Sequence, residues 1–246
     1  MADPRSTPPV LRPFVWVLRP IFWAVTKRDW RGSQHLPSTG GYVLAPNHLS
    51  YVDPFMLGHW LVAQGIPPRY MIKDPLFHVP VIGWILRHVD QIPVYRGTGA
   101  AADSVHAAVE AVNDGKVIVV YPEGTMTRDP QGWPMSGRNG AVRTAHTAGV
   151  PLVPVAQWGP QEIMWPYRRG FHLFPRKTMH IRVGEPLDLS GLGDDPTDAE
   201  LGAVTDRLMD TITAMQAEIR GELPTTPRID VRTLKKPKST LEEKES

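Results

Sequence analysis

The sequence predicts an α/β fold, in which a mostly parallel central sheet is flanked by helices and an N-terminal helical segment suits a membrane interface. Short apolar runs alternate with longer segments of helical periodicity, which is the pattern of repeated strand and helix units. The 246 residues, 41% of them hydrophobic, suit one globular domain. The 26 prolines and 21 glycines fall between the apolar segments, which indicates turns.

Six strands are expected, each a short apolar run. They are residues 42–46, 69–72, 91–95, 116–121, 152–156 and 178–184. Helices are expected between several of these strands, at residues 54–64, 79–88, 100–114 and 139–148. Residues 198–220 carry apolar side chains at steps of three and four, which predicts an amphipathic helix docked on the domain.

Residues 1–34 are expected to form a membrane-interface segment that precedes a main domain at 35–222. Residues 13–25 are apolar and aromatic, but Arg19 and Pro20 interrupt them, and a spanning helix needs about 20 apolar residues. Tryptophans interleaved with arginines are typical of the headgroup boundary. The alternative is that these aromatic side chains pack on the domain's own core. Residues 223–246 lose apolar periodicity and gain charge, which predicts a mostly unstructured tail.

Composition excludes several classes of function. With no cysteine, the chain has no disulfide framework, no thiol nucleophile and none of the common structural zinc sites. Its 27 basic and 25 acidic residues are too balanced for a nucleic-acid binder, so no nucleic-acid partner is expected. The histidines show no metal-ligand spacing such as H-E-x-x-H, and no metal site is expected.

Polar residues follow three of the predicted strands at the point where each strand ends. They are Asn47 and His48 after 42–46, Arg96 after 91–95, and Glu123, Gly124 and Thr125 after 116–121. In open α/β sheets the ligand site lies outside the carboxyl ends of the strands. If these strands are parallel, the three segments meet at one edge of the sheet and form a site there.

The stretch "NHLSYVD" places Asp53 five residues after His48. Ser50 and Asp53 match a helix-capping box, and Asp53 before a proline matches an N-cap, so either pattern would explain Asp53 without catalysis. The caps also supply a turn that leaves His48 in the preceding loop, within reach of the carboxylate. A histidine held by a carboxylate suits the removal of a proton from an alcohol near neutral pH. Because no G-x-S-x-G elbow and no cysteine is present, the alcohol itself would be the nucleophile.

Four segments, "NHLSYVD", "VYRG", "YPEGT" and "GVPLVPVA", resemble in this order the characteristic blocks of the glycerophosphate acyltransferases, especially the 1-acylglycerol-3-phosphate acyltransferases. The resemblance implies that His48 is the general base and Asp53 its orienting partner. It also implies that Arg96, with Glu123, Gly124 and Thr125, holds the glycerol phosphate of the acceptor. The family's third block commonly continues with arginine, whereas this chain has Met126 there and Arg128 two positions later.

By this resemblance the protein moves a fatty acyl group from acyl-CoA to the free hydroxyl of lysophosphatidic acid and makes phosphatidic acid. Acyl-CoA is then a co-substrate, and neither a metal nor another cofactor is expected. The expected location is the cytoplasmic face of a membrane, as a peripheral or monotopic protein. Three alternatives stay open: an acceptor such as glycerol 3-phosphate or another lysolipid, a non-catalytic lipid-binding protein, and a metal-dependent phosphoesterase with His48 and Asp53 as ligands.

Residues outside the histidine–aspartate pair have structural explanations as well. Arg96 would be a surface charge at a strand end, Glu123 a cap or the partner of a nearby arginine, and Gly124 part of a turn.

Overall fold

A computed structural model describes residues 11–94, 100–167 and 170–234, with only the backbone of 11–15 and 100–102. Its main sheet has five strands in the order β1-β7-β6-β2-β5. They are β1 (Thr26–Arg31), β2 (Tyr42–Pro46), β5 (Val117–Val119), β6 (Leu152–Trp158) and β7 (Lys177–Val183). The β6–β7 pair is antiparallel and the other pairs are parallel, which confirms the predicted α/β fold with a mostly parallel sheet.

A second, two-stranded sheet pairs β3 (Met71–Lys73) with β4 (Ile92–Val94) in parallel. It is joined to the main sheet by a bridge between Tyr70 and Val119. All six predicted strands are present, but the strand that precedes Arg96 belongs to this smaller sheet and not to the row that contains β2 and β5.

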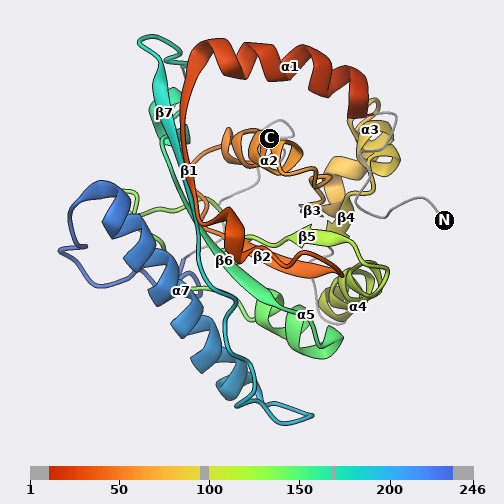
Figure 1. The fold of residues 1–246 in the computed structure, drawn as a ribbon. Helices are drawn as coiled ribbons and strands as arrows, with labels where there is room; N and C mark the ends of the chain where they lie inside the picture. Colours follow the sequence, from red (N-terminus) through yellow and green to blue (C-terminus); the bar gives the residue numbers. More distant parts are fainter. Residues whose placement is uncertain (1–10, 95–99, 168–169, 235–246) are drawn as a thin grey trace, which may run out of the picture.

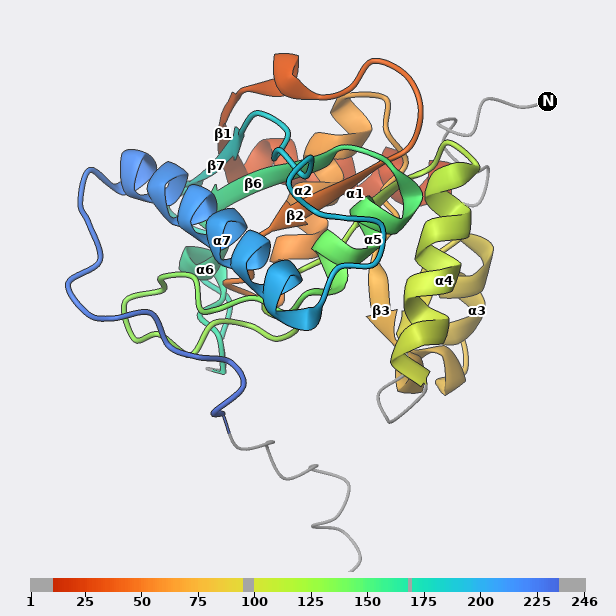
Figure 2. The ribbon, with the colours of Figure 1, turned by 90° about the horizontal axis from the view of Figure 1, so that it is seen from below.

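Helices cover both faces of the main sheet (Figures 1 and 2). On one face lie α1 (Leu11–Val25) and α2 (Asp53–Ala63), with α2 between α1 and the sheet (Figure 1). On the other lie α4 (Ala100–Asn113), α5 (Gly140–Ala148) and α7 (Asp198–Arg220). The remaining helical segments are η1 (Ser33–His35), η2 (Asp74–His78), α3 (Ile82–His88) and α6 (Pro160–Ile163).

Strand β2 is apolar at every position because both of its faces are covered by helices. Val43 and Ala45 face the cluster built with α4, α5 and α7, while Tyr42 and Leu44 face the cluster built with α2. Alternate side chains of a strand point to opposite faces, so a central strand covered by helices on both faces needs apolar residues at every position. This places the end of β2, and the residues that follow it, at a rigid edge of the sheet.

Strand β1 was not predicted, because its sequence "TKRDWR" is mostly charged. It is the outermost strand beside β7, where charged side chains can reach water and hinder pairing with another chain. Residues 26–31 therefore belong to the sheet although they fall within the predicted interface segment 1–34.

The aromatic residues of helix α1 are divided between the two expected places, the domain's own core and the exposed surface. Phe22 packs against a small cluster of Val52, Met56, Ile163 and Met179, whereas Trp16 and Trp23 on the same helix are exposed. Across the described ranges, no helix has both the length and the apolar character needed to cross a bilayer.

The described part of the predicted tail packs on the domain without forming a helix or strand. Ser136 N–H donates to the carbonyl of Ile229 at 2.9 Å, and the buried Val231 donates its N–H to Ser136 Oγ at 2.9 Å. Residues 223–234 are thus draped over the surface, and 235–246 lie outside the described residues.

Candidate active site

The parallel strands β2, β5 and β6 bring the first and third predicted segments together at one edge of the sheet. Asn47, fully buried after β2, ties the loop to β6: its Oδ1 accepts the N–H of Gln157 at 2.8 Å, and its Nδ2 donates to the Gln157 carbonyl at 3.1 Å. Nδ2 also donates to Oε1 of Gln216 on α7 at 3.1 Å. The chain that leaves β2 toward His48 is therefore held from two sides.

His48 and Asp53 form the predicted pair, with His48 Nδ1 2.8 Å from Asp53 Oδ2. Asp53 is fully buried in the first turn of α2, and the same oxygen accepts the backbone N–H groups of Leu49 and Ser50. A carboxylate at this place is favoured by the helix dipole. Because the ionised carboxylate only accepts hydrogen bonds, the contact assigns the proton of a neutral His48 to Nδ1 and leaves the lone pair on Nε2.

Only half of the predicted capping box is found at the start of α2: the Asp53 carboxylate accepts the Ser50 N–H at 2.8 Å, but the Ser50 hydroxyl does not accept the Asp53 N–H. The N-cap of α2 is Val52, without a side-chain cap, and Asp53 is the first helical residue. Ser50 Oγ instead accepts the N–H of Val52 at 3.1 Å and donates to the carbonyl of Met164 at 2.6 Å. Ser50 therefore makes the turn that brings Asp53 back to His48, and it also ties this loop to a remote segment.

The His48 ring is stacked on Tyr121, with ring centroids 4.3 Å apart and an interplanar angle of 29°. Its side chain is 18% exposed, and Nε2 makes no hydrogen bond to any of the described residues. One ring nitrogen and one ring face are thus fixed, while the other nitrogen is unengaged. This arrangement can accept a proton from a bound hydroxyl group.

Glu123 contacts the backbone of His48 and is fully buried. Its Oε1 accepts the His48 N–H at 2.8 Å, and its Oε2 accepts the Met135 N–H at 3.0 Å. Burial raises the pKa of Glu123 to about 8, although the two N–H donors act in the opposite direction. Each carboxylate oxygen thus accepts a backbone N–H, and the predicted contact of Glu123 with the acceptor stays a prediction. Glu123 positions the loop that carries His48.

Gly124 and Thr125 form the turn after Glu123. Gly124 has φ of +64°, a left-handed conformation that favours glycine, and a Cβ there would lie 3.4 Å from the Arg138 side chain. Thr125 Oγ1 lies 3.4 Å from the hydroxyl of Tyr167, which donates to the Met126 carbonyl at 2.9 Å. Arg138 and Tyr167 were not singled out from the sequence, because no local pattern links them to this turn.

Arg96 lies outside the described residues, so its role in binding the phosphate stays a prediction. Arg128 lies close to the turn, with its guanidinium carbon 5.9 Å from the ring centroid of Tyr167. Two described cations, Arg128 and Arg138, therefore lie in the part of the molecule where the second and third blocks were expected to bind a phosphate.

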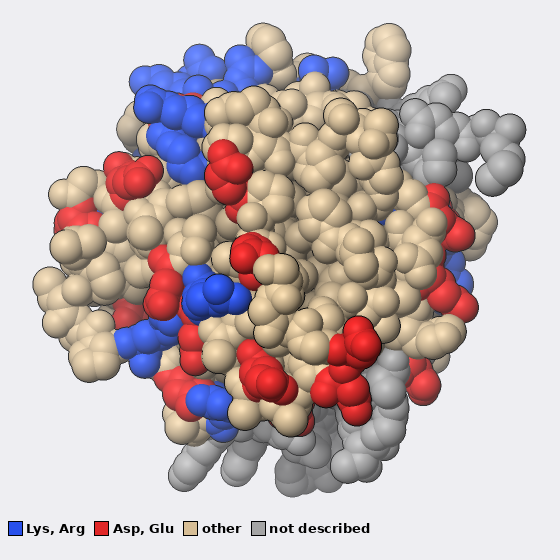
Figure 3. All heavy atoms as spheres, turned by 60° about the horizontal axis from the view of Figure 1, so that its bottom comes forward, with Lys and Arg blue, Asp and Glu red and all other residues tan. Residues whose placement is uncertain are grey.

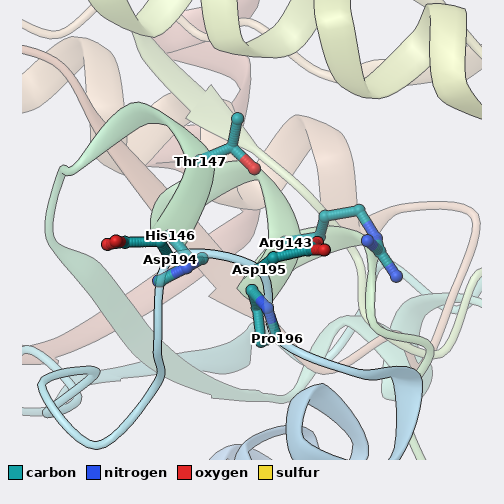
Figure 4. A pocket seen from close by; sticks show the side chains of 6 residues that line it. All are labelled: Arg143, His146, Thr147, Asp194, Asp195 and Pro196. Carbon is teal, nitrogen blue, oxygen red and sulfur yellow. The ribbon is translucent and has the colours of Figure 1, made fainter.

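A cavity of about 330 Å³ lies elsewhere, between α5 and the loop that precedes α7 (Figure 4). It is lined by Arg143, His146, Thr147, Asp194, Asp195 and Pro196. None of these residues belongs to the predicted site. Within the described part of the chain, no three His, Asp or Glu side chains are grouped closely enough to hold a metal ion.

Comparison with known proteins supports the family resemblance. A family model described as "Acyltransferase" matches residues 27–158. A Bacillus subtilis protein named 1-acyl-sn-glycerol-3-phosphate acyltransferase is 29% identical over 186 residues, which cover 76% of this chain and 86% of that protein. A Saccharomyces cerevisiae protein of the same name is 27% identical over 175 residues, which cover 70% of this chain but only 55% of its own length.

Among solved structures, the crystal structure of the 1-acyl-sn-glycerophosphate (LPA) acyltransferase PlsC from Thermotoga maritima is similar in fold. Its TM-score is 0.65 at 20% sequence identity, with 87% of this chain and 81% of that chain covered. The fold described above is therefore shared with that structure over most of the length of this chain.

Proposed function

The chain belongs to the acyltransferase family, and on that premise we propose that it transfers a fatty acyl group from acyl-CoA to the free hydroxyl of lysophosphatidic acid, forming phosphatidic acid. The observation that carries the proposal is the His48–Asp53 contact, which orients the imidazole and leaves Nε2 unengaged among the described residues. The acceptor is proposed by analogy with the Bacillus and yeast relatives, whose names specify it.

In the proposed reaction, His48 Nε2 removes the hydroxyl proton as the acceptor oxygen attacks the thioester carbonyl. The Nδ1–H bond to Asp53 stabilises the imidazolium that forms. The tetrahedral intermediate then collapses: the carbon–sulfur bond breaks, and the leaving thiolate takes the proton from His48. An ester and free coenzyme A result. The reaction as written uses acyl-CoA as co-substrate and calls for no metal or other cofactor.

Arg96, Gly124 and Thr125 are proposed to bind the acceptor's phosphate, because arginine offers a planar fork of donors and a glycine turn lets the backbone approach a ligand. Truncating a charge-assisted contact costs on the order of 1.5–3 kcal/mol, or roughly 10–150-fold in affinity. Arg96→Ala should therefore weaken lysophosphatidic acid far more than acyl-CoA. Equal weakening of both substrates would argue against the assignment.

We also propose that the protein works at the cytoplasmic face of a membrane as a peripheral or monotopic protein, since its acceptor and product reside in a bilayer. The exposed tryptophans of α1 support this location, because aromatic side chains next to cations favour the headgroup boundary.

A second acceptor class has one specific observation in its favour. An Arabidopsis thaliana protein named N-acylphosphatidylethanolamine synthase is 27% identical over 157 residues, covering 59% of this chain. The test is a matrix of donors and acceptors with mass detection of products. The donors are acyl-CoA and acyl carrier protein thioesters, and the acceptors are lysophosphatidic acid, glycerol 3-phosphate, other lysolipids and phosphatidylethanolamine.

The matrix should give phosphatidic acid from acyl-CoA and lysophosphatidic acid as the main product, with equal yield in the presence of a chelator. A phosphoesterase that depends on a metal would lose its activity with the chelator and release phosphate. A protein that binds lipid without catalysis would release no thiol from any donor.

A further inference from the structure

The segment between α6 and β7 exposes apolar side chains at its centre. Phe171 is 67% exposed and Phe174 is 74% exposed, with the partly exposed Leu173 between them. Single exposed apolar residues are normal, but two phenylalanines and a leucine within four positions concentrate apolar surface in one place. Apolar surface concentrated in this way is typical of a site that binds a partner or a membrane.

Both ends of this segment are fixed to parts of the molecule already described. At one end, the Met164 carbonyl accepts from Ser50 Oγ at 2.6 Å, and the Tyr167 hydroxyl donates to the Met126 carbonyl at 2.9 Å. These contacts join the segment to the two loops of the candidate active site, residues 47–52 after β2 and residues 120–139 after β5. Met164 and Tyr167 are therefore held against those loops by direct hydrogen bonds.

At the other end, Arg176 joins the segment to the end of α1. Its guanidinium donates to the carbonyls of Trp23 at 2.8 Å and Thr26 at 2.7 Å. Figure 1 shows the chain just before β7 beside the end of α1 that leads into β1. Arg176 therefore holds the chain that follows Phe174 against the end of α1, where Trp23 is 50% exposed and Trp16, further along the helix, is 81% exposed.

Basic residues border this surface. Lys27, Arg28, Arg176 and Lys177 lie at the ends of β1 and β7 that are next to α1. Arg31 and Arg182, toward the other ends of these strands, pair with Asp29. Figure 3 shows Lys and Arg side chains gathered at one margin of the molecule. The Arg28 guanidinium carbon also lies 3.5 Å from the ring centroid of Trp23, so a cation and an exposed aromatic ring are in direct contact. Apolar surface bordered by excess positive charge is complementary to an anionic lipid headgroup layer.

We propose that residues 171–174 form a second membrane contact, which lies beside α1 on an anionic bilayer leaflet. The two contacts together orient the protein, and the described residues 164–167 and 170–176 bond to the loops around His48 at one end and to the end of α1 at the other. This inference rests on the proposed function, in which the acceptor is a bilayer lipid.

The test uses the full chain and vesicles without substrate, so that it does not depend on catalysis. Binding of wild type and of the double variant Phe171→Ser/Phe174→Ser is compared on phosphatidylcholine vesicles with and without phosphatidylglycerol. Leu223→Ser is the matched control, because Leu223 is 75% exposed but follows α7, which covers the sheet face opposite to α1.

We expect the double variant to bind mixed vesicles roughly 10–100-fold more weakly, given the apolar area that two phenyl rings bury. Leu223→Ser should bind as wild type does, and wild type should bind pure phosphatidylcholine more weakly than the mixture. Unchanged vesicle binding by a folded double variant would overturn the proposal, as would an equal loss in Leu223→Ser. A self-association lost in the double variant while vesicle binding is unchanged would also overturn it and identify a second copy as the occupant.

A failed acyl-transfer assay with a positive vesicle result would refute the proposed reaction and leave the membrane contact standing. Acyl transfer by wild type with unchanged vesicle binding of the double variant would refute only the second contact.

Discussion

Two regions of the molecule differ in which side chains they bury. The two loops around His48 bury polar side chains, whereas α1 and residues 171–174 expose aromatic ones. In the loops, Asn47, Asp53 and Glu123 are fully buried, and backbone N–H groups donate to each of them. On the apolar surface, Trp16 and Phe174 are mostly exposed. Burying a polar group opposes folding unless it is hydrogen-bonded, whereas an aromatic group that stays exposed gains nothing from folding. In the loops the hydrogen bonds lie inside the protein, whereas the aromatic groups of the apolar surface can be buried only against something outside it.

The largest effect should come from breaking the loop side of this comparison at Asp53. In Asp53→Asn only one amide atom can take the place of Oδ2, which accepts from His48 and from two backbone N–H groups. An amide oxygen there lacks the negative charge that stabilises the imidazolium, and an NH₂ group there favours the wrong tautomer of His48. We expect kcat to fall by about 10²–10⁴-fold, with a much smaller change in acceptor KM. Steady-state kinetics on a sample with an intact thermal transition provide the measurement. A kcat within tenfold of wild type would mean that Asp53 only starts the helix.

Glu123 should affect stability and its dependence on pH. Burial raises its pKa from 4.5 to about 8, so between these values the native protein holds a proton that the unfolded chain has lost. The free energy of unfolding should therefore fall as pH rises from about 4.5 to 8 and then level off. In Glu123→Gln this contribution to the slope should be absent. The variant should also lose about 1–3 kcal/mol at pH 5, because its NH₂ group cannot accept the Met135 N–H.

Urea unfolding at several pH values between 5 and 8 measures both effects. Glu123→Asp is a useful second variant, since it keeps the ionisable group but shortens its reach. A slope that is identical in wild type and Glu123→Gln would show that Glu123 does not titrate in this range.

The smallest effect should come from Tyr167, which lies on the segment between the two regions. Tyr167→Phe removes the hydrogen bond to the Met126 carbonyl, which is worth about 0.5–1.5 kcal/mol. The turn at Gly124 and Thr125 should loosen, and acceptor KM should rise by roughly 2–10-fold with little change in kcat. A fall in kcat with unchanged KM would instead connect Tyr167 to the chemical step.

The sequence predicted those strands that are buried on both faces, because burial alone requires their residues to be apolar. Strand β2 is covered on both faces, so its sequence has to be apolar, and its predicted range matches the observed one. Strand β1 lies at an edge where side chains reach water, and no periodicity marks it. Edge strands of this kind are held by pairing with a distant partner, here β7, and that pairing leaves no local signal.

The candidate site was predicted where its partners are close in sequence. His48 and Asp53 are five residues apart, and one turn brings them together. The contact between Glu123 and His48 joins residues 75 positions apart through a backbone N–H, which every residue except proline carries, so no residue pattern reports it. For the same reason the sequence suggested a cap at Ser50, whereas its hydroxyl bonds to Met164, 114 positions away.

The most direct test of the account is the activity of His48→Ala with acyl-CoA and lysophosphatidic acid, followed by thiol release and by mass detection of the lipid product. Wild type should release one thiol for each phosphatidic acid formed. The variant should keep its thermal transition, because the His48 backbone N–H and carbonyl that bind Glu123 and Thr127 remain, and should lose about 10²–10⁴-fold in turnover. Turnover of folded His48→Ala within tenfold of wild type would contradict the account.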